Sequence, residues 1–300
     1  MASIEQEFQS YRQELIQQPE AIEATEQRYM AFLQDLTLKA ASSIYSDFNK
    51  ANSLRPFWKN YEPRQRGRSP TGNSTPWIEV AEKTVTVHII STLTRENLAT
   101  LEYPGLPLGS DVRFVINDVL IQLDVKATGP NDNQNEVVAS PFQISGDGAL
   151  WQGDGFLNSE VSVPRRGKTK EPMLFRPALP PFYILEKHRL LCLTYFLKVN
   201  YSRHLGGDQI LDYLELICVP NGLLLFDGPK YHQNTPGLLI AGKDDKSVLT
   251  GNRRTRIRFN PLATIGGWSR CVQIKQADIG WKAIPRTVTS IQLAMEQQVE

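Results

Sequence analysis

The sequence has few cysteines, no long apolar run and almost no excess of charge. Its 300 residues include three cysteines, Cys192, Cys218 and Cys271, which stand far apart among mostly apolar neighbours. We therefore expect no disulfide framework and no zinc site, but buried thiols in a reducing compartment. No apolar stretch reaches the roughly 20 residues of a membrane span, and the first ten residues lack the features of a signal peptide. We expect a cytoplasmic protein without a membrane partner.

Several common chemistries are also missing. The net charge is +1, from 33 Lys and Arg against 32 Asp and Glu, so nucleic-acid affinity would have to come from local clusters of basic side chains. The four histidines show no metal-ligand spacing. The basic run 165–170 contains the end of a phosphate-loop pattern, but Ser162 stands where that pattern needs glycine. We interpret this run as a solvated loop.

The first 48 residues indicate two helices. Apolar residues recur at helical spacing before Pro19, and a second apolar face continues to Ile44. A proline is well placed in the first turn of a helix, so Pro19 marks the start of the second one. These residues carry eight acidic and three basic side chains, so we do not expect them to face phosphate. Their apolar faces should pack against the core or a second subunit.

The rest of the chain alternates between helical and strand-like sequence. Thr75 and Pro76 predict the start of a helix. β-branched and aromatic residues separated by turn signals predict strands, in the ranges 112–126, 193–201, 210–219 and 222–226. The economical interpretation is an α/β fold in which a central mixed β-sheet is flanked by helices.

The candidate for chemistry is Asp124-Val125-Lys126, at the end of an apolar strand. Side chains alternate along a strand, so Asp124 and Lys126 share one face and Val125 points into the core. If Asp111 lies alongside on a neighbouring strand, the two carboxylates can hold a divalent cation, and Lys126 can orient or activate water. This is the nuclease pattern PD…(D/E)xK. The tripeptide alone is weak, because Asp244-Asp245-Lys246 repeats it, and a surface Asp–Lys pair is the alternative.

A first candidate DNA contact lies between residues 50 and 70. Here phenylalanine, tryptophan and tyrosine are interleaved with lysine and arginine residues. A basic, aromatic loop suits a phosphate backbone, although a solvated loop without function is also common. The candidate backbone contacts are Lys59, Arg64, Arg66 and Arg68.

A second candidate DNA contact lies within residues 242–259. Gly251-Asn252 indicates a turn, and three arginines then alternate with Thr255, Ile257 and Phe259. A two-stranded ribbon with this pattern fits the major groove, where Arg and Lys read guanine and Asp reads cytosine. The alternative is an exposed charged hairpin. The candidate base-reading residues are Lys243, Asp245, Arg256 and Arg258, with Arg254 as the third arginine.

Longer blocks of the sequence resemble the BglI-like type II restriction endonucleases. The resemblance covers roughly residues 46–260 in the family's order and spacing, whereas 84–103 and 150–175 match poorly. The matching blocks are SDFNKANSLRPFWKNY (46–61), PWIEVAEK (76–83), GLPLGSD (105–111), LDVK (123–126), GP (129–130), SPFQISGDG (140–148), PPFYIL (180–185), VPNGLLLF (219–226) and GKDD (242–245).

The resemblance implies a homodimeric, Mg²⁺-dependent restriction endonuclease that acts on double-stranded DNA and is paired with a cognate DNA methyltransferase. It implies an interrupted palindrome, GCCNNNNNGGC or a close relative, cut to 5′-phosphate and 3′-hydroxyl ends with 3′ overhangs. It also implies a restriction-endonuclease-like core in one domain. The predicted parts of this 1–300 domain are acidic helices (1–48), a catalytic core (75–148) and a DNA-reading β-hairpin (237–260).

The resemblance also assigns roles to the candidate residues. Asp111 and Asp124 become metal ligands together with the Val125 carbonyl, and Lys126 becomes the catalytic lysine. Glu82 becomes the helix acid of the active site, with Glu79, one turn away, as the alternative.

Two departures from the family pattern affect the predicted sites. The run before the arginines is about two residues longer than in the family, so the base-reading pair is either Arg256 and Arg258 or Arg254 and Arg256. Ser110 replaces the proline of the wider group, which should be harmless because the carboxylate holds the metal. A non-cleaving sequence-specific DNA-binding protein and a repair or junction nuclease are the alternative functions.

Overall fold

The computed structural model describes residues 3–57, 75–96, 101–102, 110–166, 171–185, 188–242 and 253–288. The α-helices are α1 (Ile4–Ile16), α2 (Pro19–Lys50), α3 (Thr75–Arg95), α4 (Gly222–Phe226), α5 (Tyr231–Asn234) and α6 (Phe259–Leu262). The 3₁₀ helices within these ranges are η1 (Ala51–Phe57), η4 (Pro141–Gln143) and η5 (Leu205–Gly207).

The strands fall into one large sheet and three small ones. The strands of the large sheet are β1 (Val112–Ile116), β2 (Val119–Thr128), β8 (Phe182–Leu185), β9 (His188–Arg203), β10 (Gln209–Val219), β13 (Cys271–Gln276) and β14 (Trp281–Pro285). The strands of the small sheets are β3 (Glu136–Ala139), β11 (Leu239–Ala241) and β12 (Thr255–Arg258), then β4 (Leu150–Gln152) with β5 (Gly155–Leu157), and β6 (Val161–Val163) with β7 (Met173–Phe175).

The large sheet is mixed. Its strand order is β1-β2-β9-β10-β13-β14, with β8 also paired to β9. β2 and β9 run parallel over ten residue pairs, and the other pairings in this sheet are antiparallel. The predicted α/β fold with a central mixed sheet is confirmed.

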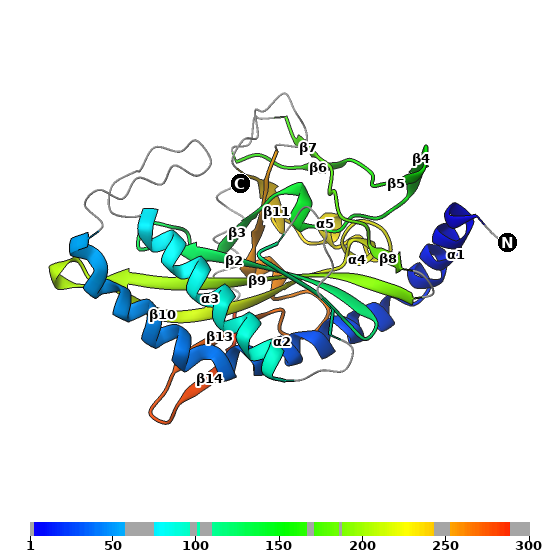
Figure 1. The fold of residues 1–300 in the computed structure, drawn as a ribbon. Helices are drawn as coiled ribbons and strands as arrows, with labels where there is room; N and C mark the ends of the chain where they lie inside the picture. The colour runs from blue at the N-terminus through cyan, green and yellow to red at the C-terminus, as the bar shows by residue number, and fades with distance from the viewer. Residues whose placement is uncertain are drawn as a thin grey trace.

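The two N-terminal helices form as predicted. Pro19 occupies the first turn of α2, where its missing N–H costs no hydrogen bond. α2 buries a continuous apolar stripe that includes Ile22, Leu33 and Ile44. Figure 1 shows α2 and α3 lying across the same side of the long strands β9 and β10. These helices therefore bury one face of the large sheet.

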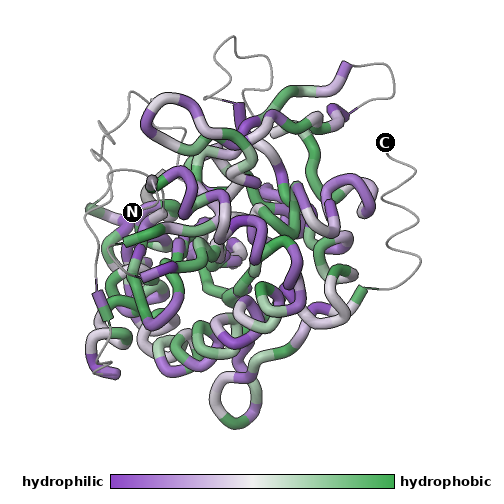
Figure 2. Tube along the Cα trace, turned by 90° about the vertical axis from the view of Figure 1, so that its right-hand side faces the viewer, coloured by the Kyte–Doolittle hydropathy of each residue, from purple (hydrophilic) through white to green (hydrophobic). Residues whose placement is uncertain are grey.

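The alternation along β2 separates the two faces of the sheet. Leu123 and Val125 pack in the core cluster that contains the apolar residues of α2 and α3. Asp124 and Lys126 consequently point to the opposite face, because side chains alternate along a strand. On that face a second cluster joins Phe196 of β9 to residues of β3, β11 and β12. Figure 2 shows hydrophobic and hydrophilic stretches alternating along the trace.

The predicted hairpin 237–260 is part of a three-stranded sheet. β11 pairs antiparallel with β12, and β12 also pairs antiparallel with β3, where Thr255 is opposite Ala139 and Arg258 opposite Glu136. The predicted hairpin therefore forms as the antiparallel pair β11 and β12, with β3 as a third strand beside β12. β12 is a central strand, and its buried face holds Thr255 and Ile257.

The prediction of a strand at 222–226 is wrong, because these residues form the helix α4. The side chain of Asn221 accepts a hydrogen bond from the Leu223 N–H and so caps the helix. A β-carbon on Gly222 would come within 1.9 Å of the Gly146 carbonyl oxygen. Burial on all sides makes the leucine run look like a strand in the sequence, whereas the cap and this close contact set the helix.

All three cysteines are buried and free, as predicted. Among the described residues, no helix is long and apolar enough to cross a membrane.

Candidate active site

The hairpin of β1 and β2 brings the two predicted carboxylates together. The register pairs Val112 with Leu123, so Asp111, one residue before β1, lies beside Asp124. Asn117 closes the hairpin with φ of 52°, a left-handed conformation that asparagine tolerates. The apolar alternation of the two strands and this tight turn fix the register.

Asp111 is anchored to the backbone of β2. Its Oδ2 accepts a hydrogen bond of 2.8 Å from the Val125 N–H. The carboxylate therefore takes the place of a backbone acceptor just before the first residue of β1. Asp111 is exposed, so its remaining lone pairs face solvent or a bound ligand.

The Asp124 carboxyl is buried and has a raised pKa. The residue is 3% exposed, and burial raises its pKa to about 6, with a further contribution from the charge of Asp111 and an opposing one from Lys126. Its Oδ2 faces the Lys126 ammonium and its Oδ1 accepts a hydrogen bond from Gln143 Nε2. Removing this carboxylate from water disfavours its charged form unless a cation is nearby.

This donor set suits a hard divalent cation. The described part of the chain contains no group of three or more His, Cys, Asp or Glu side chains placed to hold one metal ion. Two carboxylates are sufficient for Mg²⁺, which keeps several waters and takes further oxygens from substrate phosphates. Positive charge between Asp111 and Asp124 would also offset the burial of Asp124. The residues present therefore fit such an ion.

Lys126 lies partly open beside these acids. Its side chain is 28% exposed, and its Nζ stands 5.9 Å from the centre of the Phe196 ring. The ammonium can thus contact both Asp124 and a ligand approaching from solvent. The roles of Asp111, Asp124, Val125 and Lys126 stay predictions.

Glu82 and Glu79 lie on α3, which packs on the other face of the sheet. Glu82 is close enough to Tyr201 to contribute to its pKa, which burial first, then Asp132 and Glu82, raise to about 12. Glu82 therefore lies near the ends of β2 and β9, and its role as the helix acid stays a prediction.

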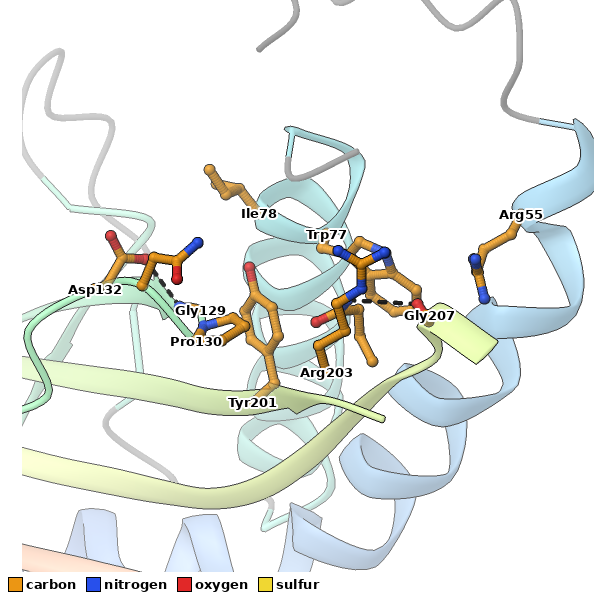
Figure 3. Close-up of a pocket in the computed structure, with 11 residues that line it drawn as sticks. Arg55, Trp77, Ile78, Gly129, Pro130, Asp132, Tyr201, Arg203 and Gly207 are labelled. Atoms are coloured by element: carbon orange, nitrogen blue, oxygen red, sulfur yellow. Dashed lines mark hydrogen bonds between the residues drawn. The ribbon is translucent and has the colours of Figure 1, made fainter. Parts of the chain in front are cut away.

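A cavity of about 410 Å³ opens at this end of the sheet (Figure 3). Gly129 N–H donates to Asp132 Oδ2 at 2.9 Å and shapes the turn on one side of it. Asp111 and Asp124 are not among its lining residues. The lining residues labelled in Figure 3 are Arg55, Trp77, Ile78, Gly129, Pro130, Asp132, Tyr201, Arg203 and Gly207.

The candidate base-reading residues lie partly in the small sheet. Arg256 and Arg258 share a face of β12 and are half-buried, while Arg254 precedes the strand. Arg256 Nη1 forms an ion pair with Glu136 Oε1. Lys243 and Asp245 lie outside the described residues. The base-reading roles of all five residues stay predictions.

Of the basic residues between 50 and 70, the structure describes Lys50 and Arg55. Arg55 Nη1 is 2.6 Å from Asp208 Oδ1, so this arginine is tied to η5 and the start of β10. The predicted backbone contacts lie outside the described residues: Lys59, Arg64, Arg66 and Arg68.

Three polar residues near the site were not singled out from the sequence. Gln143 contacts Asp124 directly. Glu136, whose side chain is 4% exposed, pairs with Arg256 and also, at 2.9 Å, with Arg166, whose side chain is 60% exposed. Lys198 is 1% exposed and donates to the backbone carbonyls of Asn133, Gln134 and Glu136. Only Gln143 had a signal, because it lies in the matching block 140–148.

Solved structures define the class of protein. The crystal structure of the restriction endonuclease BglI bound to its DNA recognition sequence superposes with a TM-score of 0.80 and 31% identity, covering 91% of this chain and 96% of that one. The crystal structure of the tetrameric restriction endonuclease SfiI bound to cognate DNA shares the fold, with a TM-score of 0.60 at 12% identity, 89% of this chain and 94% of that chain. The chain is a type II restriction endonuclease.

Sequence comparisons identify its family. The family model described as Restriction endonuclease BglI matches residues 3–274. The type II restriction enzyme BglI of Bacillus subtilis is 32% identical over an alignment of 282 residues that covers 86% of this chain and 94% of that enzyme. The protein belongs to the BglI family of restriction endonucleases. The alternative of a non-cleaving DNA-binding protein is therefore not retained.

Proposed function

We propose that this enzyme hydrolyses both strands of duplex DNA in a Mg²⁺-dependent reaction at an interrupted palindrome, GCCNNNNNGGC or a close relative. The observation that carries the proposal is the convergence of Asp111, Asp124 and Lys126 at the end of the β1–β2 hairpin. The relative BglI was crystallised on its DNA recognition sequence, which supports duplex DNA as the substrate. The products are 5′-phosphate and 3′-hydroxyl ends with 3′ overhangs.

Asp111, Asp124 and the Val125 carbonyl would hold the Mg²⁺ ion. Bound there, the ion would supply positive charge to the scissile phosphate and lower the pKa of the attacking water. The protein's own part is positional: the Val125 N–H fixes Asp111, and the partly exposed Lys126 ammonium orients water and phosphate oxygen beside Asp124. Glu82 is the residue we assign to a second metal or its waters.

Recognition is assigned to the β12 face and the segments on either side of it. Arg256 and Arg258 lie on one face of β12, where guanidinium groups can read guanine in the major groove. We assign Lys243 and Asp245 to the same G·C pairs and Arg254 to the alternative register. Lys59, Arg64, Arg66 and Arg68 are assigned to the DNA backbone.

A two-fold target implies two copies of the chain. Each half of a palindrome presents the same bases, so one reading surface per subunit requires a homodimer. A cytoplasmic enzyme of this kind also requires protection of the host DNA, which we assign to a cognate methyltransferase of the same specificity.

The test is digestion of linear phage DNA with and without Mg²⁺, followed by sequencing of the fragment ends. The expected result is a discrete set of fragments that share one interrupted palindrome, formed only with Mg²⁺. The Asp124→Ala enzyme should bind the same sequence and leave it uncut. Fragments with unrelated ends, or equal cutting by Asp124→Ala, would contradict the proposal, and sedimentation of the DNA complex as a monomer would contradict the dimer.

A further inference from the structure

The Asp124 carboxylate is held by two different partners, one on each oxygen. Oδ2 faces the Lys126 ammonium, whereas Oδ1 accepts a hydrogen bond from the side-chain amide of Gln143. Lys126 is on the same strand and is partly exposed. Gln143 comes from η4 and is 8% exposed. The orientation of a buried carboxylate therefore depends on an amide contributed by a separate element.

The orientation of the Gln143 amide is itself fixed. The Ser140 N–H donates a hydrogen bond of 2.9 Å to Gln143 Oε1. With its carbonyl oxygen held in this way, the amide directs its donor nitrogen at Asp124. An amide fixed at one end cannot exchange donor and acceptor without losing both bonds.

The turn that carries Gln143 is held from both ends. The Gln143 N–H donates to the Ser140 carbonyl at 3.1 Å, and the Ala178 N–H donates to the Pro141 carbonyl at 2.9 Å. Ser140 directly follows β3, whose last residue, Ala139, pairs with Thr255 of β12. The donor to Asp124 thus stands on a turn anchored to the small sheet.

We propose that Gln143 is a positioning residue for Asp124 and fixes the carboxylate in the orientation in which it meets a divalent cation. The inference rests on the proposed function of Asp111 and Asp124 as metal ligands. Partners that orient metal-binding carboxylates typically contribute about 10- to 100-fold to metal affinity or activity. Gln143 contacts neither the DNA nor the reacting atoms in this role.

The chain offers a matched control for the test. Gln122 is 0% exposed and lies two residues before Asp124 on the same face of β2. Its amide atoms make no hydrogen bond within the described part of the protein. Gln122→Leu and Gln143→Leu thus make the same chemical change on the same side of the sheet, but only the second removes a bond to Asp124.

The first measurement is Mn²⁺ binding to the free enzyme by electron paramagnetic resonance, with Mn²⁺ as a probe that accepts the same oxygen ligands as Mg²⁺. Gln143→Leu should raise the dissociation constant about 10-fold or more, and the Mg²⁺ concentration for half-maximal cleavage should rise with it. Gln122→Leu should change neither by more than about twofold, well below that range. Binding of cognate DNA without metal should be unchanged in both variants.

A second pair of variants leaves Gln143 in place. Ser140→Pro removes the N–H that holds Gln143 Oε1, and the Ser140 φ of −83° is close to the proline value. Ser140→Ala keeps that N–H and, like Ser140→Pro, loses the hydroxyl that accepts from the Gln143 N–H in the capping box, so the two variants differ in the N–H. Ser140→Pro should weaken Mn²⁺ binding in the same direction as Gln143→Leu, by a smaller factor, and Ser140→Ala should match the wild type. This pair decides the matter if Gln143→Leu does not fold.

Native Mn²⁺ affinity in Gln143→Leu, or in Ser140→Pro if Gln143→Leu does not fold, would overturn the inference. An equal loss in Gln122→Leu would also overturn it, because the effect would then be one of core packing. The proposed function fails separately: in that case Asp124→Ala would bind Mn²⁺ as the wild type does. A normal Gln143→Leu beside a defective Asp124→Ala would reject only the role of Gln143.

Discussion

Asp124 and Arg256 are both assigned to the DNA complex, but the protein holds them in different ways. Asp124 lies on the ten-residue strand β2, between β1 and β9, and two side chains contact its carboxylate. Arg256 lies on the four-residue strand β12, is half-buried, and forms an ion pair with Glu136. The proposed catalytic end is thus built into the large sheet, whereas the proposed recognition end stands on a small one.

The difference indicates how each region would respond to DNA. Contacts within a well-packed sheet keep the catalytic groups in place before the substrate arrives, which is what electrostatic catalysis requires. The Glu136 carboxylate is shared by Arg256 and Arg166, so a base or phosphate can replace one of its partners without leaving the acid unpaired. We therefore expect changes at the catalytic end to remove cleavage and changes at the recognition end to reduce discrimination.

The largest effect should come from Lys126→Ala. Loss of the ammonium beside Asp124 removes the positive charge that we propose faces the scissile phosphate and should lower kcat by at least about 100-fold. Affinity for cognate DNA without metal should stay within a few fold. Single-turnover cleavage and fluorescence anisotropy measure the two quantities, and Lys282→Ala, an exposed lysine on β14, is the control. A Lys126→Ala enzyme that cuts normally would break the comparison at its catalytic end.

Arg256→Ala should have the next largest effect, and on recognition. Loss of a bidentate contact to guanine costs about 1–3 kcal/mol of discrimination at one base pair. Cleavage of a panel of sites that differ at single positions should show relaxed selectivity at one position in each half-site. The same panel with Arg254→Ala and Arg258→Ala distinguishes the two possible pairs. Equal loss at all sites for Arg256→Ala would identify it as a backbone contact instead.

The catalytic hairpin was predictable from the sequence because its information is local. Alternation along 112–126 and the spacing of Asp111 and Asp124 are properties of one hairpin, and the structure places the two acids side by side. The contact from Gln143 depends on a turn nineteen residues further along. The cap of α4 by Asn221 and the third strand beside β12 depend on packing between distant segments. Local patterns do not specify such contacts.

Lys198 lies between the two regions and gives a prediction about pH. Burial lowers its pKa to about 8, against the opposing charges of Glu215 and Glu136. Below pH 8 both the folded and the unfolded chain carry the charge, so the cost of burying it is fully present. Between pH 8 and the ordinary lysine value of about 10.5 the unfolded chain binds more protons, so this group makes stability rise with pH.

Lys198→Met removes that trend. The variant also loses the donor to the carbonyls of Asn133, Gln134 and Glu136, so its stability should be lower at every pH. The diagnostic quantity is the difference in the free energy of unfolding between wild type and variant, from urea titrations at several pH values. It should grow by on the order of 2 kcal/mol from pH 7 to pH 10.5. Parallel stability curves would show that Lys198 does not titrate in this window.

The smallest effect should come from Arg28→Ala, at the far end of the catalytic hairpin. Arg28 Nη2 is 2.5 Å from Asp118 Oδ2, and the two side chains are 57% and 52% exposed. Exposed pairs of this kind contribute about 0–1 kcal/mol. Thermal unfolding should therefore shift little and kcat should be unchanged, because the buried alternation of β1 and β2 sets the register. A clear fall in kcat would instead show that the turn at Asp118 controls how Asp111 meets Asp124.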